Sequence, residues 1–218
     1  MQLDHIFLRT PAGAPEAALL LELGLTEGSP NQHAGQGTAN RRFFFHNAFL
    51  ELLWIADPAE VANATTRPTQ LAQRLDPAQS ASPFGFCFRP TEATGTAPFP
   101  SWAYCPGYLP AGMQVDIASD TPLHEPMWFF LTQAVAPAQA PLARRQPLQH
   151  TLGVRAITAV TLTIPTACNW SSAAQIASAS AGITLQRGSS HLLELCFDYG
   201  VQGRSIDLRP ALPLLLRL

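Results

Sequence analysis

Short runs in which hydrophobic and polar positions alternate open the chain. The first, LDHIFLRTP, would place Leu3, His5 and Phe7 on one face of a strand, because successive side chains of a strand point to opposite faces. GAPEAALLLELGL follows with apolar residues at helical spacing and a glycine near its end, which is a typical stop signal. RRFFFH and AFLELLWI then flank Asn47 as the strands of a hairpin would. Residues 1–56 are therefore predicted to form a β-α-β-β module, which one more strand would complete as β-α-β-β-β.

The remaining sequence divides into a connector, a middle part, a linker and a last part. The polar connector, residues 57–81, holds a short predicted helix before Asp76-Pro77. Residues 82–133 hold the predicted strands PFGFCFRP, MQVDIA and MWFFLTQ, with a proline-rich irregular stretch between the first two. An alanine- and proline-rich linker, residues 134–150, leads into residues 151–218.

The last part repeats the first in outline. ITAVTLTIP echoes LDHIFLRTP, SSAAQIASASAGI supplies a helix, HLLELCFD a strand, and RSIDLRPAL takes the place of AFLELLWIADP. This alignment puts Glu51 on Asp207. We therefore predict that residues 3–55 and 157–209 superpose as β-α-β-β modules of one compact domain.

Glu51 interrupts an apolar run, FLELLWI, in which both strand faces are otherwise hydrophobic. It would share one face with Phe49, Leu53 and Ile55. A carboxylate moved out of water costs several kcal/mol unless it accepts hydrogen bonds, pairs with a cation or binds a metal. A partner for Glu51 is therefore predicted.

Composition narrows the class of protein. With 218 residues, 47% of them hydrophobic and 13% charged, the chain can bury a sizeable core. All thirteen basic residues are arginine and the net charge is −2, so no nucleic-acid partner is expected and lysine chemistry is excluded. The four scattered cysteines favour reduced thiols over disulfides. Without a run of about 18 apolar residues or a secretion signal, we expect no membrane partner and a cytoplasmic location.

The module that starts with LDHI and ends with FLELLWI resembles the vicinal oxygen chelate superfamily, which includes glyoxalase I, methylmalonyl-CoA epimerase and the extradiol dioxygenases. Bacterial glyoxalase-like domain proteins carry patterns similar to HAGQGTANRRFFFHNAFLELLWI, PFGFCFRP, PFPSWAYCPGYLPAGM and QHTLGVRAIT. The resemblance implies an α+β fold of the glyoxalase, bleomycin-resistance and dioxygenase type. In that fold, paired β-α-β-β-β modules form curved mixed sheets around a cleft.

The resemblance also implies a divalent metal ion in the cleft and no organic cofactor. In metal-binding relatives the first and last strands of each module usually give one ligand apiece, and His5 and Glu51 match the pair of the first module. An imidazole with a carboxylate suits zinc, nickel, manganese or iron.

The second pair of ligands departs from the pattern. If PFGFCFRP opens the second module, Phe84 or Gly85 stands where a histidine is expected, and if the last part is the second module, Ala159 stands there and only Asp207 remains. Two ligands alone would hold a metal weakly. The site is either completed by one of three other histidines or has lost its metal and kept the cleft; these histidines are His33, His124 and His150.

Further residues are candidates for substrate binding. The resemblance includes His33, Thr38 and Asn40 in and after a glycine-rich loop, where Gly35 and Gly37 are predicted to adopt tight backbone geometry. The other candidates are Arg89 as a carboxylate clamp and His150. Trp102, Tyr104 and Tyr108 of the proline-rich stretch form either lid packing or an aromatic wall for a ligand.

Two functions of different class fit this sequence. In the first, a metal-dependent lyase, isomerase or dioxygenase binds two oxygens of a small substrate, and Glu51 ligates the metal or shuttles a proton. In the second, a metal-free cleft binds or sequesters a small aromatic or apolar molecule, and a purely structural role is a third reading. The cleft would lie within one chain or across a homodimer.

Overall fold

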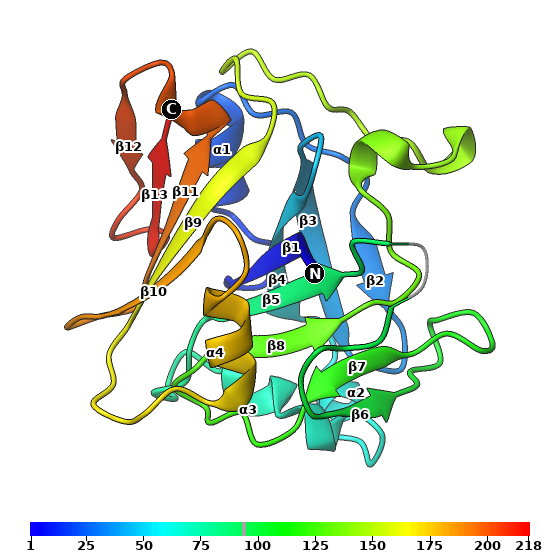
Figure 1. Ribbon diagram of the computed structural model, residues 1–218. Coiled ribbons are helices and arrows are strands. Elements are labelled where there is room, and N and C mark those ends of the chain that lie inside the picture. Colours follow the sequence, from blue (N-terminus) through cyan, green and yellow to red (C-terminus); the bar gives the residue numbers. More distant parts are fainter. Residues whose placement is uncertain (93–94) are drawn as a thin grey trace.

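The computed structural model describes residues 1–92 and 95–218, and its strands form two sheets (Figure 1). The larger is an eight-stranded sheet in the order β2-β3-β4-β1-β5-β8-β7-β6. Its strands are β1 (Gln2–Arg9), β2 (Asn31–His33), β3 (Thr38–Phe44), β4 (Phe49–Ile55), β5 (Phe84–Arg89), β6 (Ser101–Tyr104), β7 (Val115–Ala118) and β8 (Met127–Phe130).

The eight-stranded sheet is built from two modules that meet at its centre. In the first, β1 pairs with β4 in parallel, and helix α1 (Ala17–Glu22) lies between β1 and β2 in the chain. In the second, β5 pairs with β8 in parallel, and β1 and β5 join the two modules as antiparallel neighbours. The predicted α+β class with paired modules and mixed sheets is confirmed, and the second module spans the middle part of the chain.

The second module departs from the pattern of the first in its helix. Among the residues that the structure describes between β5 and β6, none is helical. Two short helices instead precede the module, α2 (Pro58–Val61) and α3 (Leu71–Leu75), and the second of these confirms the helix predicted before Asp76-Pro77.

The last part of the chain forms its own five-stranded sheet in the order β10-β9-β11-β13-β12. Strand β9 lies between β10 in parallel and β11 in antiparallel direction, whereas β1 of the first module pairs in parallel with the final strand of its module. The elements are β9 (Ile157–Ile164), α4 (Ser172–Ser178), β10 (Ile183–Arg187), β11 (Leu192–Phe197), β12 (Ser205–Asp207) and β13 (Leu214–Arg217).

The predicted superposition of the first and last parts is therefore wrong. Asp207 lies on the edge strand β12, where it is exposed and pairs with Arg209, while Glu51 lies on an inner strand of the other sheet. Both parts share the order strand, helix, strand, strand, but the order of elements does not fix which strands pair.

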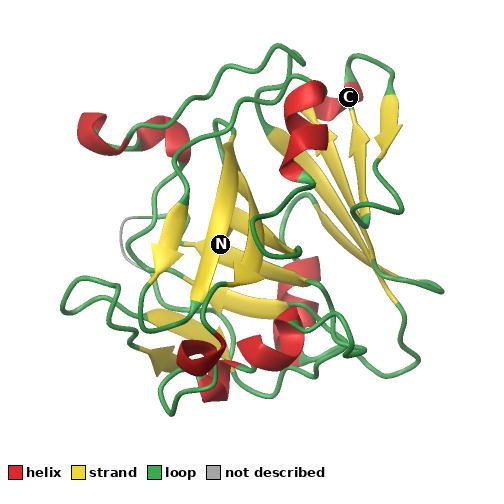
Figure 2. Cartoon of the chain, turned by 180° about the vertical axis from the view of Figure 1, so that it is seen from behind, coloured by secondary structure: helices red, strands yellow, loops and turns green. Residues whose placement is uncertain are grey.

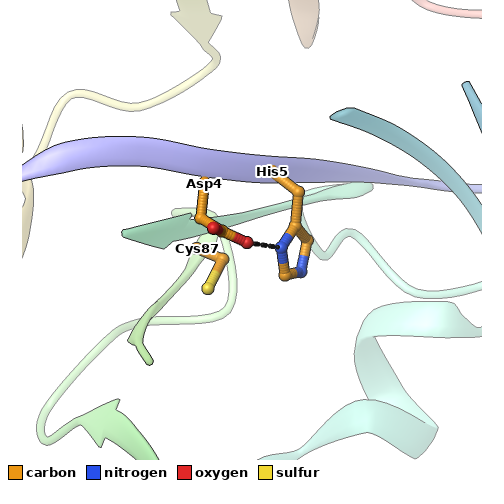
Figure 3. A group of neighbouring side chains, drawn as sticks. All are labelled: Asp4, His5 and Cys87. Carbon is orange, nitrogen blue, oxygen red and sulfur yellow. Dashed lines mark hydrogen bonds and ion pairs between the residues drawn. The ribbon is translucent and has the colours of Figure 1, made fainter. Parts of the chain in front are cut away.

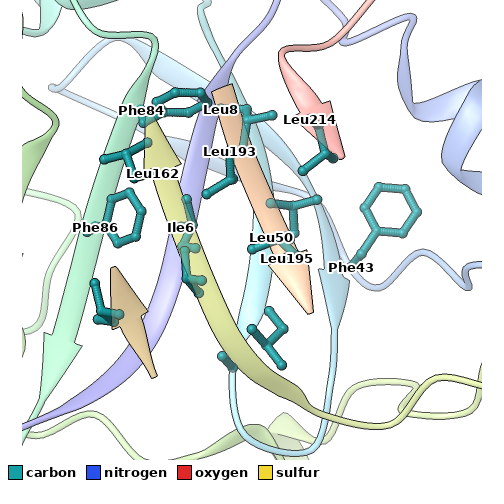
Figure 4. Packing of buried hydrophobic residues seen from close by; sticks show 14 of the residues in the cluster. Ile6, Leu8, Phe43, Leu50, Phe84, Phe86, Leu162, Leu193, Leu195 and Leu214 are labelled. Atoms are coloured by element: carbon teal, nitrogen blue, oxygen red, sulfur yellow. The ribbon is translucent and has the colours of Figure 1, made fainter. Parts of the chain in front are cut away.

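The two sheets pack face to face through one hydrophobic core (Figure 4). Because strand side chains alternate, Ile6 and Leu8 of β1 point toward the smaller sheet, where Leu162, Leu193 and Leu195 meet them. The opposite face of the larger sheet carries a second apolar cluster that includes Phe7, Leu53, Cys87, Tyr104 and Phe129. The smaller sheet thus covers one face of the larger, and the other face is left to form a site.

Short helices surround the sheets (Figure 2), and the buried residues of α1 and α4 belong to the core that the two sheets share. The predicted linker holds two single-turn 3₁₀ helices, η2 (Pro137–Gln139) and η3 (Leu142–Arg144). Two further 3₁₀ turns are η1 (Arg67–Thr69) and η4 (Asp198–Gly200). None of the helices in residues 1–92 and 95–218 is long and apolar enough to cross a membrane.

Candidate functional site

A cavity of about 190 Å³ opens on the face of the larger sheet that the smaller sheet leaves uncovered. The charged, imidazole and amide side chains that line it come from the first module: His5, His33, Gln36, Asn40, Arg42 and Glu51. The lining from β7, β8 and the residue after β8 is apolar: Val115, Met127, Phe129 and Leu131. The ionisable and amide groups of the cavity therefore come from the first module, and the second module contributes apolar side chains and the tyrosines Tyr104 and Tyr108.

A β-bulge in β1 brings Asp4 and His5 together. Leu3 pairs with Phe88 and His5 pairs with Cys87, so Asp4 is one extra residue between these two pairs. The side chains of Asp4 and His5 can therefore meet, and Asp4 Oδ1 lies 2.7 Å from His5 Nδ1 (Figure 3). Both residues are buried. The hydrogen bond orients the imidazole and leaves its second nitrogen, Nε2, for the cavity.

Glu51 lies beside this second nitrogen. His5 Nε2 and Glu51 Oε2 are 3.7 Å apart, while Glu51 Oε1 accepts a hydrogen bond from Asn40 Nδ2. If Nδ1 carries the proton of the neutral imidazole and donates a hydrogen bond to Asp4, Nε2 and Glu51 Oε2 face each other as two acceptors. Two acceptors repel unless a proton or a cation lies between them. The buried Glu51 thus accepts a hydrogen bond from the Asn40 amide at Oε1 and faces the His5 imidazole at Oε2.

Two aromatic rings fix the position of His5. Phe49 stacks on the imidazole with ring centroids 4.3 Å apart, and Phe129 meets it edge-on at 5.4 Å. Phe49 belongs to the first module and Phe129 to the second. The imidazole therefore stands where the two modules meet.

His33 reaches the cavity from the hairpin between β2 and β3. Gly35 and Gly37 have φ of +80° and +79°, and a Cβ at Gly37 would collide with the Asp57 carbonyl, so the predicted tight geometry is confirmed. His33 Nδ1 lies 2.8 Å from Thr38 Oγ1, and its ring packs against Tyr108 with centroids 4.7 Å apart. Burial lowers the pKa of His33, although the charge of Glu51 opposes this shift.

Among the candidate site residues, the structure brings His5, His33, Asn40, Glu51 and Tyr104 to one cavity. It does not bring the other candidates there. Arg89 donates a hydrogen bond to the Leu3 carbonyl at 2.5 Å and lies 3.5 Å from Asp4 Oδ2, while Trp102 lines a different hollow beside β7. Thr38 is buried behind His33 and bonds to it.

His150 and His124 also lie away from the cavity lining. His150 Nδ1 accepts from the Thr26 backbone N–H at 3.0 Å, and Nε2 lies 2.9 Å from the Phe44 carbonyl, so both ring nitrogens are used in packing. Burial lowers the pKa of His150, in keeping with a neutral ring. Neither histidine completes a metal site with His5.

Two polar residues of the cavity, Gln36 and Arg42, were not predicted from the sequence, whereas Tyr108 was among the aromatic residues predicted for a ligand-binding wall. Arg42 lies directly opposite Glu51 in the register of β3 and β4, so the two side chains share a face of the sheet. The register of that hairpin, counted outward from Asn47, contained this signal. Tyr108 lies in the proline-rich stretch, and its hydroxyl donates to Gln36 Oε1 at 3.3 Å. Burial raises the pKa of Tyr108.

The residues of the second module do not fit the metal site that the resemblance implies. Gly85 pairs with Phe7, and an added Cβ at Gly85 would collide with the Phe7 ring, so a histidine has no room there. Facing His5 and Glu51, β8 presents Met127 and Phe129. Catalytic zinc sites have three protein ligands, whereas His5 and Glu51 supply two. Although His33 lines the same cavity, it does not form a group with both of them whose ligand atoms lie within 4.8 Å of one another.

A second group of candidate ligands lies beneath the cavity floor. The ligand atoms of Asp4, His5 and Cys87 lie within 4.8 Å of one another (Figure 3). All three are buried, and burial raises the pKa of the Cys87 thiol well above its usual range, with Asp4 and Glu51 adding to the shift. Since Asp4 already bonds to His5 and lies near Arg89, this group is a packed polar floor.

Residues 3–98 match the model of the glyoxalase-like domain family. This match over residues 3–98 confirms the predicted resemblance to the glyoxalase-like domain proteins of the vicinal oxygen chelate superfamily.

No curated protein matches the chain. Among solved structures, a crystal structure of a hypothetical protein from Staphylococcus aureus is similar, with a TM-score of 0.54 and 10% sequence identity over 99% of this chain and 98% of that chain. At this identity the likeness concerns the fold alone.

Proposed function

We propose that this protein binds a small organic molecule in the cavity between its two modules without a protein-held metal ion. The observation that supports this most directly is the division of the lining, with His5, Asn40 and Glu51 on one side and Met127 and Phe129 on the other. Such a lining suits a ligand with one polar end and an apolar body. The metal-dependent alternative lacks its second pair of ligands.

The size of the cavity bounds the ligand. A cavity of about 190 Å³ is of the order of engineered protein cavities of about 150 Å³ that hold benzene. The body of the ligand is therefore about one ring. Glu51 Oε2 accepts a hydrogen bond from a hydroxyl or amine at the polar end, and His5 Nε2 accepts or donates according to its protonation.

Whether the cavity holds a metal ion can be tested by comparing ligands of different chemistry. A metal held by His5 and Glu51 would favour two adjacent oxygens on the ligand, because both can enter its coordination shell. A metal-free cavity has no such preference. Phenol and catechol differ by one adjacent hydroxyl, and they are therefore suitable probes.

A second candidate function is catalysis of proton transfer. It is favoured by the carboxylate of Asp4 on His5 Nδ1, since an oriented imidazole beside a second carboxylate is an arrangement used for general acid–base catalysis. The test is exchange of the α-protons of hydroxyacetone for deuterium, followed by NMR. Exchange that depends on His5 and Glu51 supports catalysis. Exchange at the rate seen in buffer alone contradicts catalysis and is compatible with a protein that only binds its ligand.

The proposed function is tested by calorimetric titration of phenol into protein purified without a metal-chelating tag. Leu131→Trp would fill the cavity from its apolar side, and Leu142→Trp, at a residue that is 79% exposed, is the matched control. We expect phenol binding to be lost in the first variant and kept in the second. Equal binding by both variants, or none by the wild type to any single-ring probe, would contradict the proposal.

A further inference from the structure

A groove adjoins the cavity on the side of the linker. It has a volume of about 480 Å³ and shares five lining residues with the cavity: His5, Arg42, Phe49, Leu109 and Leu131. Its outer wall consists of residues 133–146, which include the 3₁₀ helices η2 and η3. A ligand in the cavity therefore has room to extend into this groove past the shared residues.

Arg42 is the only charged side chain, apart from the titratable His5, that lines both spaces within the described residues. Its Nε donates to the Ser29 carbonyl at 2.9 Å, and its guanidinium carbon lies 5.1 Å above the Phe44 ring. Glu51 is directly opposite on the next strand, yet the two form no ion pair among the described residues. Arg42 is therefore turned along the sheet toward the groove.

The donors of Arg42 are largely unused. A guanidinium has five N–H donors, and in the described chain only Nε of Arg42 has a hydrogen-bond acceptor. The side chain is partly buried, and this burial lowers the pKa of Arg42 while the charge of Glu51 opposes the shift. An anion placed against the two terminal nitrogens would offset the cost of that burial, because charge-assisted and bidentate hydrogen bonds are the strong ones.

The other charges around the groove support an anion. Arg144 lines it and is exposed, and no side-chain partner of Arg144 is found in residues 1–92 and 95–218. The one carboxylate in the lining, Asp4, is held by His5 and lies near Arg89. The cavity thus contains the carboxylate of Glu51, Arg42 lies where the cavity meets the groove, and Arg144 lines the groove.

We propose that the ligand is a small organic acid, whose hydrogen-bond donor lies at Glu51, whose ring fills the cavity and whose carboxylate binds Arg42 at the entrance to the groove. This inference rests on the proposed function and adds the charge of the ligand. Arg42 is then a residue that sets specificity, and Arg144 adds a weaker attraction because it is exposed to solvent.

The test compares acids with their neutral amides by calorimetric titration. The probes are 4-hydroxybenzoate, 4-hydroxyphenylacetate and 3-(4-hydroxyphenyl)propionate, each beside the corresponding amide, so that each pair differs only in the charge of one end. We expect at least one acid to bind about tenfold more tightly than its amide. In Arg42→Gln this acid should lose about tenfold in affinity, while its amide changes by less than about twofold.

Arg41→Gln is the matched control. Arg41 is the neighbouring residue on β3, points to the opposite face and pairs with Glu27 at 2.5 Å. Its loss should leave the acid-to-amide ratio unchanged. Equal affinity for every acid and its amide in the wild type, or an equal loss for both in Arg42→Gln, would overturn the anion site while leaving the cavity as a binding site. Absence of binding by all six probes would overturn the anion site, and the Leu131→Trp comparison with phenol would then decide the proposed function separately.

Discussion

His5 is held in one orientation from three sides. Asp4 lies 2.7 Å from Nδ1, and the rings of Phe49 and Phe129 pack against the imidazole. Nε2 is thereby directed at Glu51 without the ring having to be ordered when a ligand arrives. Groups that are ordered beforehand lose less entropy on binding, and this favours affinity.

Gly35 and Gly37 allow a comparison of backbone strain with steric collision in one hairpin. Gly35→Ala should lower the free energy of unfolding by about 1 kcal/mol, because φ is positive but the space beside the residue is open. Gly37→Ala should lower it by about 2 to 4 kcal/mol, because the new Cβ also collides with the backbone of Asp57 and Val61. Denaturation in urea measures both variants. Equal losses would show that the hairpin geometry is wrong.

His191 is expected to make stability depend on pH. Burial, with smaller contributions from Arg9 and His124, lowers the pKa of His191 from 6.5 to about 4. The unfolded chain therefore binds more protons than the folded chain between these values, so stability should be lost as the pH falls from about 6.5 to about 4. Thermal melts of the wild type and His191→Gln across this window check the sign. The variant should show a flatter profile, and a profile as steep as that of the wild type would assign the effect to other groups.

At the scale of elements, the buried Glu125 joins the second module to helix α4. Glu125 accepts from the Ser171 backbone N–H at 2.8 Å and from the Trp128 indole N–H at 3.2 Å. Ser171 is the N-cap of α4, and Arg74 of α3 donates to the Glu125 carbonyl at 2.7 Å. Three elements distant in sequence therefore meet at Glu125: β8 and α4 at its carboxylate, and α3 at its main-chain carbonyl.

Glu125→Gln should destabilise the protein by about 2 to 4 kcal/mol, because an amide replaces an acceptor of three hydrogen bonds and leaves the buried Arg74 without its neighbouring charge. Glu22→Gln, at an exposed end of α1, is the control and should change stability by less than about 0.5 kcal/mol. Chemical denaturation measures both variants. Similar stabilities for the two would contradict the structural role of Glu125.

Elements could be predicted from sequence where their pattern is local. The alternation of LDHIFLRTP and FLELLWI placed Ile6 and Leu8 on the covered face, with His5 and Glu51 on the other. The bulge at Asp4 could not be predicted, because it exists only in the pairing of β1 with β5. The same limit explains why Asp207 was wrongly aligned with Glu51. The sequence indicates the strands of the last sheet but not which strands pair with each other.

At the scale of the whole molecule, the smaller sheet and the cavity use opposite faces of the eight-stranded sheet. The covered face is a continuous apolar core, so it supplies stability. The open face carries the buried carboxylate, imidazole and amide, which cost stability unless they have partners. Within the described residues, the carboxylate, imidazole and amide groups that line the cavity come from the first module only. We infer from this asymmetry that the ligand has one polar and one apolar end.

The ratio of the dissociation constants of catechol and phenol, measured by calorimetry before and after dialysis against EDTA, distinguishes a metal-free cavity from a metal site held by His5 and Glu51. We predict that the ratio lies between about one third and three and that dialysis does not change it. In Glu51→Gln both probes should bind about tenfold more weakly, because the carboxylate itself accepts the hydrogen bond from the hydroxyl. Much tighter binding of catechol that EDTA abolishes and zinc restores would show instead that His5 and Glu51 hold a metal ion, and would contradict the account.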